Sequence, residues 1–260
     1  MIKLFRQVRH SLIMKNQTSK PAFQTGRYFK YAIGEIVLVV IGILIALQIN
    51  NWNQNRMSKL EEGKLLRKIQ VDLKLADSMN QRFLSSFTNY QNLNIQVFSE
   101  IRGKAYYNPN MMYHDLWWYS TYNAVISENY SDNLTDITND NVRDALRDYL
   151  KHEEILLKAF KNWDLLKIET VRPFVNKYGI KNVDTIFSKL DFNFKNAFNL
   201  EFDIFNYSKL RAQYGTEELE QILGSLYTMT GYIILKLEEQ KTYLDHLDKA
   251  LKLRLQDKNN

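Results

Sequence analysis

The chain has 260 residues, 45% of them hydrophobic, a formal net charge of +6 and no cysteine, which excludes disulfides, thiolate metal sites and cysteine nucleophiles. Residues 1–30 hold seven Lys and Arg and no acid, whereas residues 31–260 hold 28 basic and 29 acidic residues, a net charge of −1. The basic excess therefore belongs to one short segment, and we expect no nucleic-acid partner.

Residues 1–30 are predicted to be a basic cytoplasmic leader. Its apolar residues recur at helical spacing with basic residues between them; they are Ile2, Phe5, Val8 and Leu12. This pattern is typical of a short helix that lies on an anionic inner leaflet. A disordered basic tail is the alternative that the composition leaves open.

Residues 31–50 are predicted to be a transmembrane helix. Between Tyr31 and Ile49 only Glu35 and Gln48 are strongly polar. At about 1.5 Å per residue this run spans roughly 28 Å, close to the thickness of the hydrocarbon core. A buried helix of a soluble protein rarely runs this long without a polar face. No small-residue cleavage site follows, so we expect an uncleaved signal anchor.

The flanks of the span predict its orientation. The basic leader precedes it, and mixed charges follow it, so the positive-inside rule places the N-terminus in the cytoplasm. Tyr28 and Tyr31 on the inner side and Trp52 on the outer side suit the aromatic belts of a lipid bilayer. We therefore expect a single-pass protein of the inner membrane whose C-terminal domain is periplasmic.

Glu35 is the most unusual residue of the span. On a helix it shares one stripe with Gly42 and Ala46, a small-residue pair that allows two helices to approach closely. An acid within a span is costly unless it is paired, protonated or near the interface. Two interpretations stay open: this stripe is an association surface for a second copy or another membrane protein, or Glu35 reaches the cytoplasmic headgroups.

Residues 51–260 are predicted to be one exported helical domain. After the span, apolar residues recur every three or four positions, and Gly103 follows as a stop signal. The stripe comprises Leu66, Ile69, Leu73, Ala76, Asn80, Phe83, Phe87, Tyr90, Asn94, Val97 and Ile101. This spacing predicts left-handed bundle or coiled-coil packing. Asn80 and Asn94 either fix the register of the helices or face a wet edge.

Four further helices are expected. The second opens with Asn108 as its cap and Pro109 in its first turn. A third long helix starts at about Asn141, is disturbed at Pro173 and ends near Gly179. A shorter helix lies within residues 199–215.

The last helix is expected from about Glu217 to Gln256, and its apolar run 222–237 is too short and too rich in Ser and Thr to be a second span. The fold class is therefore all-α: one transmembrane helix followed by an antiparallel bundle of long helices.

Several stretches resemble a known family. They are the start "MIKLFRQVRH", the span "YAIGEIVLVVIGILIALQINNWN" and the later "STYNAV" and "LTDITNDNVRDALRDYL". Together they resemble a bacterial family of single-pass membrane proteins, domain of unknown function 6090, found mainly in Bacteroidota. The resemblance implies an exported helical domain on an anchor, and it brings no activity, substrate or catalytic residue.

The sequence offers little chemistry. No nucleophile-elbow, zinc-protease, dinucleotide or phosphate-loop motif occurs, so we expect no enzyme and no cofactor. The "HEE" run that starts at His152 could contribute to a metal site, but it is more typical of a solvated helix face. The aromatic cluster "LWWYSTY", residues 116–122, could line a pocket or fill the core, and we favour the core.

Two classes of function fit these features. The first is a binding or scaffolding component of the cell envelope. The second is a sensory input module that signals laterally to another membrane protein, an interpretation that rests on fold analogy alone.

Overall fold

The computed structural model describes residues 25–118, 121–189 and 204–257. The chain divides into two units, Met1–Leu60 and Glu61–Asn260, each of which is described by itself. The expected structure of the basic leader lies almost entirely outside the described residues, as do the side chains of Tyr28 and Tyr31.

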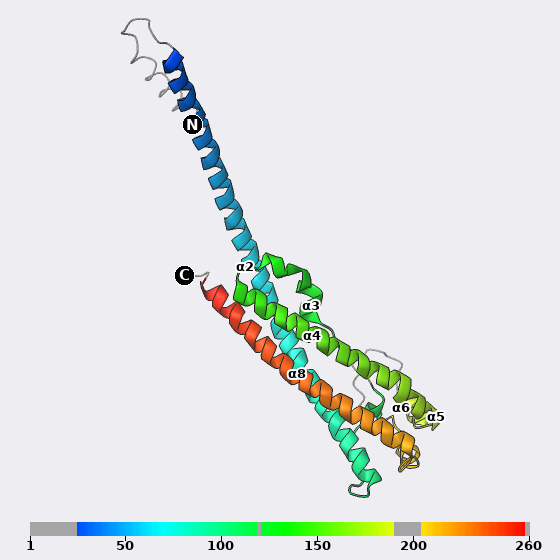
Figure 1. Cartoon of the computed structure of the whole chain (residues 1–260). Helices are drawn as coiled ribbons and strands as arrows, with labels where there is room; N and C mark the ends of the chain where they lie inside the picture. The colour runs from blue at the N-terminus through cyan, green and yellow to red at the C-terminus, as the bar shows by residue number, and fades with distance from the viewer. Residues whose placement is uncertain (1–24, 119–120, 190–203, 258–260) are drawn as a thin grey trace. The chain divides into compact units, whose positions relative to one another are not determined.

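The described part of the first unit is a stretch of the helix α2 (Thr25–Ile101), shown in blue in Figure 1. From Ala32 to Leu60 every residue is exposed, so no other described part of the chain covers its apolar side chains. This stretch is long and apolar enough to cross a bilayer, and it is the one such helix among the described residues. The run 222–237 of the last helix does not meet these criteria, as expected.

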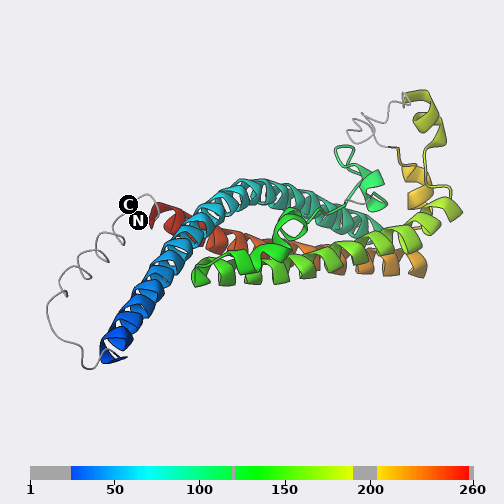
Figure 2. The same cartoon turned by 90° about the horizontal axis from the view of Figure 1, so that it is seen from above.

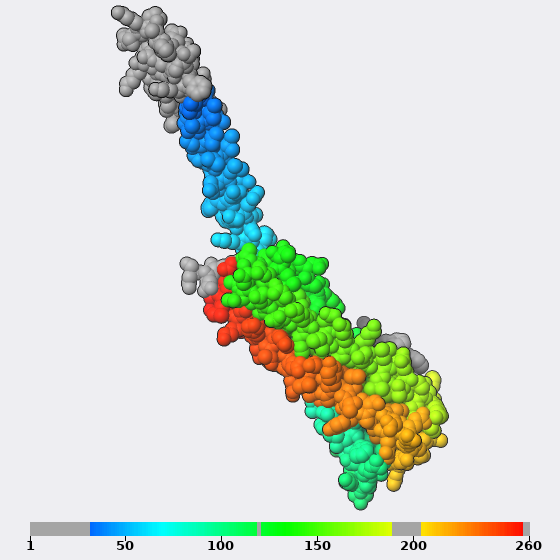
Figure 3. All heavy atoms as spheres, viewed as in Figure 1, coloured from blue at the N-terminus to red at the C-terminus, as the bar shows by residue number. Residues whose placement is uncertain are grey.

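Three long helices build the second unit: the part of α2 from Glu61 onward, α4 (Asp140–Leu166) and α8 (Glu217–Asp257). Helices α4 and α8 lie side by side, as Figures 2 and 3 show. All but two members of the α2 stripe are buried, and the other two are half-buried, which confirms the predicted core face. Helix α2 ends two residues before Gly103, whose φ of 67° is the left-handed conformation that favours glycine at a helix end.

The third predicted helix is confirmed together with its disturbance. Asn139 caps α4 by accepting a hydrogen bond from the Val142 amide. After Leu166 the chain continues as a π-helical turn, η3 (Lys167–Val171), and then as α5 (Arg172–Lys177). Pro173 has no amide hydrogen, and its ring would clash with the carbonyl four residues earlier in a regular helix. A wider π turn directly before the proline accommodates both constraints.

The predicted second helix is wrong. Residues 104–139, the connecting segment, contain only η1 (Tyr113–Leu116), α3 (Val125–Tyr130) and η2 (Ser131–Asp136) among their described residues. Asn108 accepts a hydrogen bond from the Asn110 amide at 3.0 Å, which makes a local turn instead of a helix cap. Polar groups of this segment bond instead to side chains of the long helices α2 and α4.

Two short helices complete the unit, α6 (Val183–Lys189) and α7 (Tyr207–Arg211). Helix α7 falls within the range predicted for a short helix, and α8 matches the predicted last helix closely. The described residues contain no strand beyond an isolated bridge between Lys181 and Phe205. The all-α fold class is therefore confirmed.

Candidate functional site

Two apolar clusters fill the bundle, one at the end where Glu62 lies and one at the end where Glu100 lies. The Glu62-end cluster includes Leu66, Ile69, Leu73, Ala76, Ile126, Val142, Leu146, Tyr149, Leu244, Leu247 and Leu251. The Glu100-end cluster includes Phe87, Tyr90, Val97, Tyr113, Trp117, Leu156, Phe160, Trp163, Leu226, Ile233 and Leu237. On each long helix the chain therefore passes from one cluster to the other within a short stretch.

Buried polar residues occupy that stretch on all three helices. Asn80 lies between the clusters on α2, His152 and Glu153 lie between them on α4, and Gln240 lies between them on α8. We call these four residues the polar layer. None of them is more than 4% exposed. A polar cross-section through an otherwise apolar bundle is costly, so it is the first candidate for a functional site.

Asn80 joins two of the helices. Its Nδ2 donates to the Leu237 carbonyl of α8 at 3.0 Å, while its Oδ1 has no hydrogen-bond partner. Asn80 and Asn94 are both 3% exposed, so neither faces a wet edge, and the bond from Asn80 to α8 agrees with a role in helix register.

Gln240 is 1% exposed, and neither its Oε1 nor its Nε2 has a hydrogen-bond partner. Its amide lies beside the Tyr149 hydroxyl but outside hydrogen-bond geometry, and that hydroxyl donates its own hydrogen to Glu153 at 2.9 Å. Three buried polar atoms of Asn80 and Gln240 are thus unsatisfied at the centre of the bundle. Such atoms cost stability and call for a functional or conformational reason.

Glu153 connects the layer to the connecting segment. Its carboxylate accepts bonds from the amide (2.7 Å) and the hydroxyl of Ser127, from the Tyr149 hydroxyl and, at 3.4 Å, from the Tyr122 hydroxyl. Burial raises the pKa of the Glu153 carboxyl, and the bonds from Ser127, Tyr149 and Tyr122 oppose this rise without cancelling it. Glu153 therefore holds α3 against α4.

His152 faces the opposite helix. Its Nε2 lies 2.9 Å from the Lys236 carbonyl of α8, and its ring stacks on Tyr243 at a centroid distance of 4.7 Å. Of the "HEE" run only Glu154 is exposed, where it pairs with Lys158. Among the described residues no group of three or more side chains is placed to hold a metal ion. The arrangement links α4 to α8 through a histidine.

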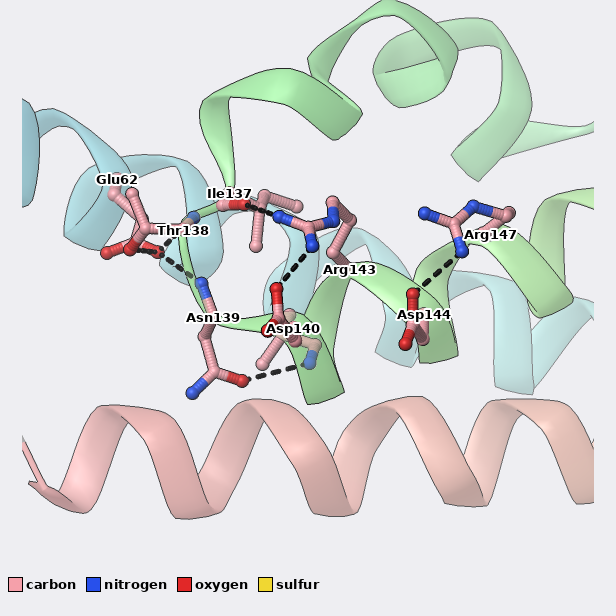
Figure 4. A network of polar contacts seen from close by, with 9 residues as sticks. Glu62, Ile137, Thr138, Asn139, Asp140, Arg143, Asp144 and Arg147 are labelled. Carbon is pink, nitrogen blue, oxygen red and sulfur yellow. Dashed lines mark hydrogen bonds and ion pairs between the residues drawn. The ribbon is translucent and has the colours of Figure 1, made fainter.

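Glu62 fixes the other end of the connecting segment, as Figure 4 shows. Its Oε1 accepts from the Thr138 amide at 2.8 Å, the Thr138 hydroxyl at 2.7 Å and the Asn139 amide at 3.3 Å. Its Oε2 accepts from Arg254 of α8 at 3.0 Å. One buried carboxylate thus ties α2, α8 and the start of α4 together.

Glu100 and Lys167 fix the beginning of the segment. Glu100 accepts from the hydroxyls of Tyr113 at 2.6 Å and of Tyr207 and Tyr214 at 2.7 Å. Burial raises the pKa of the Glu100 carboxyl, but the bonds from the three tyrosines and Gln96 outweigh it, so the pKa lies below its ordinary value.

Lys167 lies in the π turn and is 1% exposed. Its Nζ donates to the carbonyls of Asp115 and Leu116 and lies 4.2 Å from the centroid of the Trp163 ring. Burial holds the pKa of Lys167 well below its ordinary value. Two carbonyls and an aromatic face together satisfy the ammonium group.

The aromatic cluster "LWWYSTY" is mainly core. Leu116 and Trp117 are 5% exposed and belong to the Glu100-end cluster, with Trp118 and Tyr122 packed against it. An open hollow of about 300 Å³ lies beside Tyr122 and is otherwise lined mainly by α4. Residues 119–120 lie outside the described residues.

The anchor residues singled out from the sequence all lie on α2. Glu35, Gly42 and Ala46 are exposed, and Gly42 has open space around it. Trp52 is 65% exposed, with the Arg56 guanidinium 5.8 Å from its ring centroid. No other described part of the chain contacts Gly42, so the proposed association surface at the stripe stays a prediction.

The buried charged residues belong to no known motif, but their spacing in the sequence marks them. Core positions of α4 and of the π turn that follows it lie at three- and four-residue spacing, and Glu153 and Lys167 occupy two of these positions. Gln240 does the same on α8, between Leu237 and Leu244. A charged or amide side chain in the phase of an apolar stripe therefore points to a buried polar contact.

Comparison with known proteins supports the family resemblance. Residues 35–108 match the model of a family described as "Family of unknown function (DUF6090)". No curated protein and no solved structure matches the chain. The match begins in the apolar part of α2 and continues beyond the end of that helix at Ile101.

Proposed function

We propose that this chain, which carries the DUF6090 domain over residues 35–108, is a membrane-anchored binding or scaffolding component of the cell envelope. The observation that carries the proposal is the composition of α2, one helix that contains both an apolar stretch long enough to span a bilayer and a core stripe of the bundle. A helix of this kind leaves no loop in the chain between anchor and domain. Such a protein presents its bundle to a partner in the cell envelope.

The expected location follows from the charges. The seven basic residues before Tyr31 favour a cytoplasmic N-terminus. The anchor would then lie in the inner membrane and the bundle in the periplasm. The sequence contains no recognisable catalytic motif. The buried charged groups described above form hydrogen bonds with other groups of this chain.

The anchor supplies the proposed association surface. If helices pack at Gly42 and Ala46, the Glu35 carboxyl can bond across the contact instead of facing lipid. Interhelical polar contacts in membranes average well under about 2 kcal/mol, so the small-residue groove must supply much of the association. Gly42→Ile is therefore expected to weaken association more than Glu35→Gln, which keeps hydrogen-bonding capacity.

The experiment is in-cell cross-linking of the full-length chain followed by purification from membranes. A homo-oligomer or a reproducible envelope partner that is lost with Gly42→Ile supports the proposal. Gly34→Ile, on the same helix but outside the stripe, is the matched control. A chain that stays monomeric and captures no partner contradicts the proposal and leaves Glu35 as an interfacial acid.

A sensory input module is the second candidate, and the polar layer favours it. A bundle whose core is divided by polar groups has a natural place for a change of packing, which a signal requires. Any signal would pass laterally to another membrane protein. A transducer encoded by a neighbouring gene would favour the sensor, and envelope or transport machinery would favour the scaffold.

A further inference from the structure

We propose that the polar layer is a conformational joint, at which the Glu62 half of the bundle opens while the Glu100 half stays folded. The Glu62 half comprises the segments of α2, α4 and α8 that carry the Glu62-end cluster, and the Glu100 half carries the other cluster. This inference concerns how the bundle moves, and it holds whether the domain is a scaffold or a sensor.

The layer involves the three long helices and the connecting segment. Asn80 lies on α2 and bonds to α8, His152 lies on α4 and contacts α8, and Glu153 bonds to Ser127 of the connecting segment. No apolar cluster is continuous through this layer. Cooperative units in proteins follow continuous packed cores, so a break across the whole section favours two units.

The unsatisfied atoms make the closed layer costly. Asn80 Oδ1 and both polar atoms of the Gln240 amide are buried without a partner. Water can reach these groups when the layer opens, and it then supplies the hydrogen bonds that the closed state lacks. The layer therefore lowers the cost of separating the two halves, whereas an apolar layer would raise it.

The Glu62 half is the one expected to open first. Among the described residues its cluster contains 14 buried members, against 24 in the Glu100-end cluster. The larger cluster also holds the stacked rings around Trp163 and the caged Lys167. Less buried apolar surface means a smaller free energy of opening.

Hydrogen–deuterium exchange of the full-length chain in lipid nanodiscs tests this inference without a substitution. Residues 66–76 of α2 are expected to exchange about tenfold faster than residues 87–97 of the same helix, because the former belong to the weaker half. Fraying predicts the opposite order, since residues 87–97 are nearer the end of α2 at Ile101. Equal rates, or faster exchange of residues 87–97, would overturn the proposal.

A substitution in the layer provides a second test. Gln240→Leu replaces two unsatisfied atoms with apolar surface and should join the clusters, so the tenfold ratio is expected to shrink to about threefold or less. Gln221→Leu, an exposed glutamine on the same helix, is the control and should leave the ratio unchanged. A ratio that Gln240→Leu leaves intact contradicts a joint at this layer, and circular dichroism of each variant identifies one that fails to fold.

Discussion

The three long helices and the connecting segment use the same bundle in different ways. The helices contribute side chains at three- and four-residue spacing, and apolar contact between them forms both clusters. Residues 104–139 contribute buried side chains too, but their position is fixed by Glu62, Glu100, Glu153 and Lys167, which reach them from the helices. The long helices are thus stabilised by apolar side chains at regularly spaced positions. The irregular segment is instead fixed by individual charged side chains.

The largest expected effect comes from the helix core. Trp163 is fully buried, stacks on Tyr90 and faces Lys167. Trp163→Ala is expected to lower the free energy of unfolding by about 3–5 kcal/mol, through lost burial and a residual cavity. Leu165→Ala, at a 41% exposed position of the same helix, is the control. Urea denaturation in detergent checks both, and similar losses for the two variants would contradict the assigned core.

The next effect concerns the connecting segment. Glu62→Leu leaves the amides of Thr138 and Asn139 without their acceptor and removes the ion pair with Arg254. We expect a loss of about 2–3 kcal/mol, since buried donors of this kind are costly to leave unpaired. Glu61→Leu, which removes an exposed ion pair with Lys64, should cost less than about 1 kcal/mol. If the two neighbouring substitutions proved equivalent in denaturation, Glu62 would not fix this segment.

The pKa values of Glu100 and Glu153 are shifted in opposite directions. The contributions of these two carboxyls to folding stability are therefore expected to change in opposite directions with pH. The pKa of Glu100 is lowered from 4.5, so its contribution to stability is present above that value and is lost as pH falls through the folded-state pKa. The pKa of Glu153 is raised, so the folded state binds this proton more tightly, and stability increases as pH falls through the raised pKa toward 4.5.

Unfolding free energies of wild type, Glu100→Gln and Glu153→Gln across this pH range test the pair. Relative to Glu153→Gln, wild type should gain stability on acidification from neutral pH. Relative to Glu100→Gln, it should lose stability below pH 4.5. The same sign for both differences would contradict the assigned environments.

The smallest effect lies where the segment meets α4. Asn139→Ala removes the side-chain acceptor of the Val142 amide and should cost about 1 kcal/mol. Asn141→Ala, two residues later at an exposed position, should be nearly neutral. Thermal melts of the two variants check this prediction. A larger loss of stability for Asn141→Ala than for Asn139→Ala would contradict Asn139 as the cap of α4.

Most of the helical architecture was predictable, because the stripe from Leu66 to Ile101, the helix start near Asn141 and the stop at Gly179 depend on local periodicity and backbone preference. The connecting segment was not, since Asn108 and Pro109 resemble a helix start in isolation. Its course depends on bonds to residues far away in the chain, such as that between Ser127 and Glu153. Long-range polar contacts of this kind leave no periodic pattern.

The candidate site was likewise predictable only where it depends on local spacing in the sequence. The sequence placed Asn80 in the core stripe, and burial confirms it, but the coincidence of Asn80, Glu153 and Gln240 at one level required the packing of three helices. The proposed association surface of Glu35, Gly42 and Ala46 stays a prediction, because no other described part of the chain contacts Gly42.

Topology is the most direct test of the central claim, that a membrane anchor carries the bundle outside the cytoplasm. The chain has no cysteine, so single substitutions can be labelled with a membrane-impermeant maleimide in spheroplasts of a Gram-negative host. Ser78→Cys, at an exposed position of the bundle, is expected to react in intact spheroplasts, and Lys15→Cys in the leader only after lysis. The reverse pattern, or labelling of Ser78→Cys only after lysis, would contradict an exported domain.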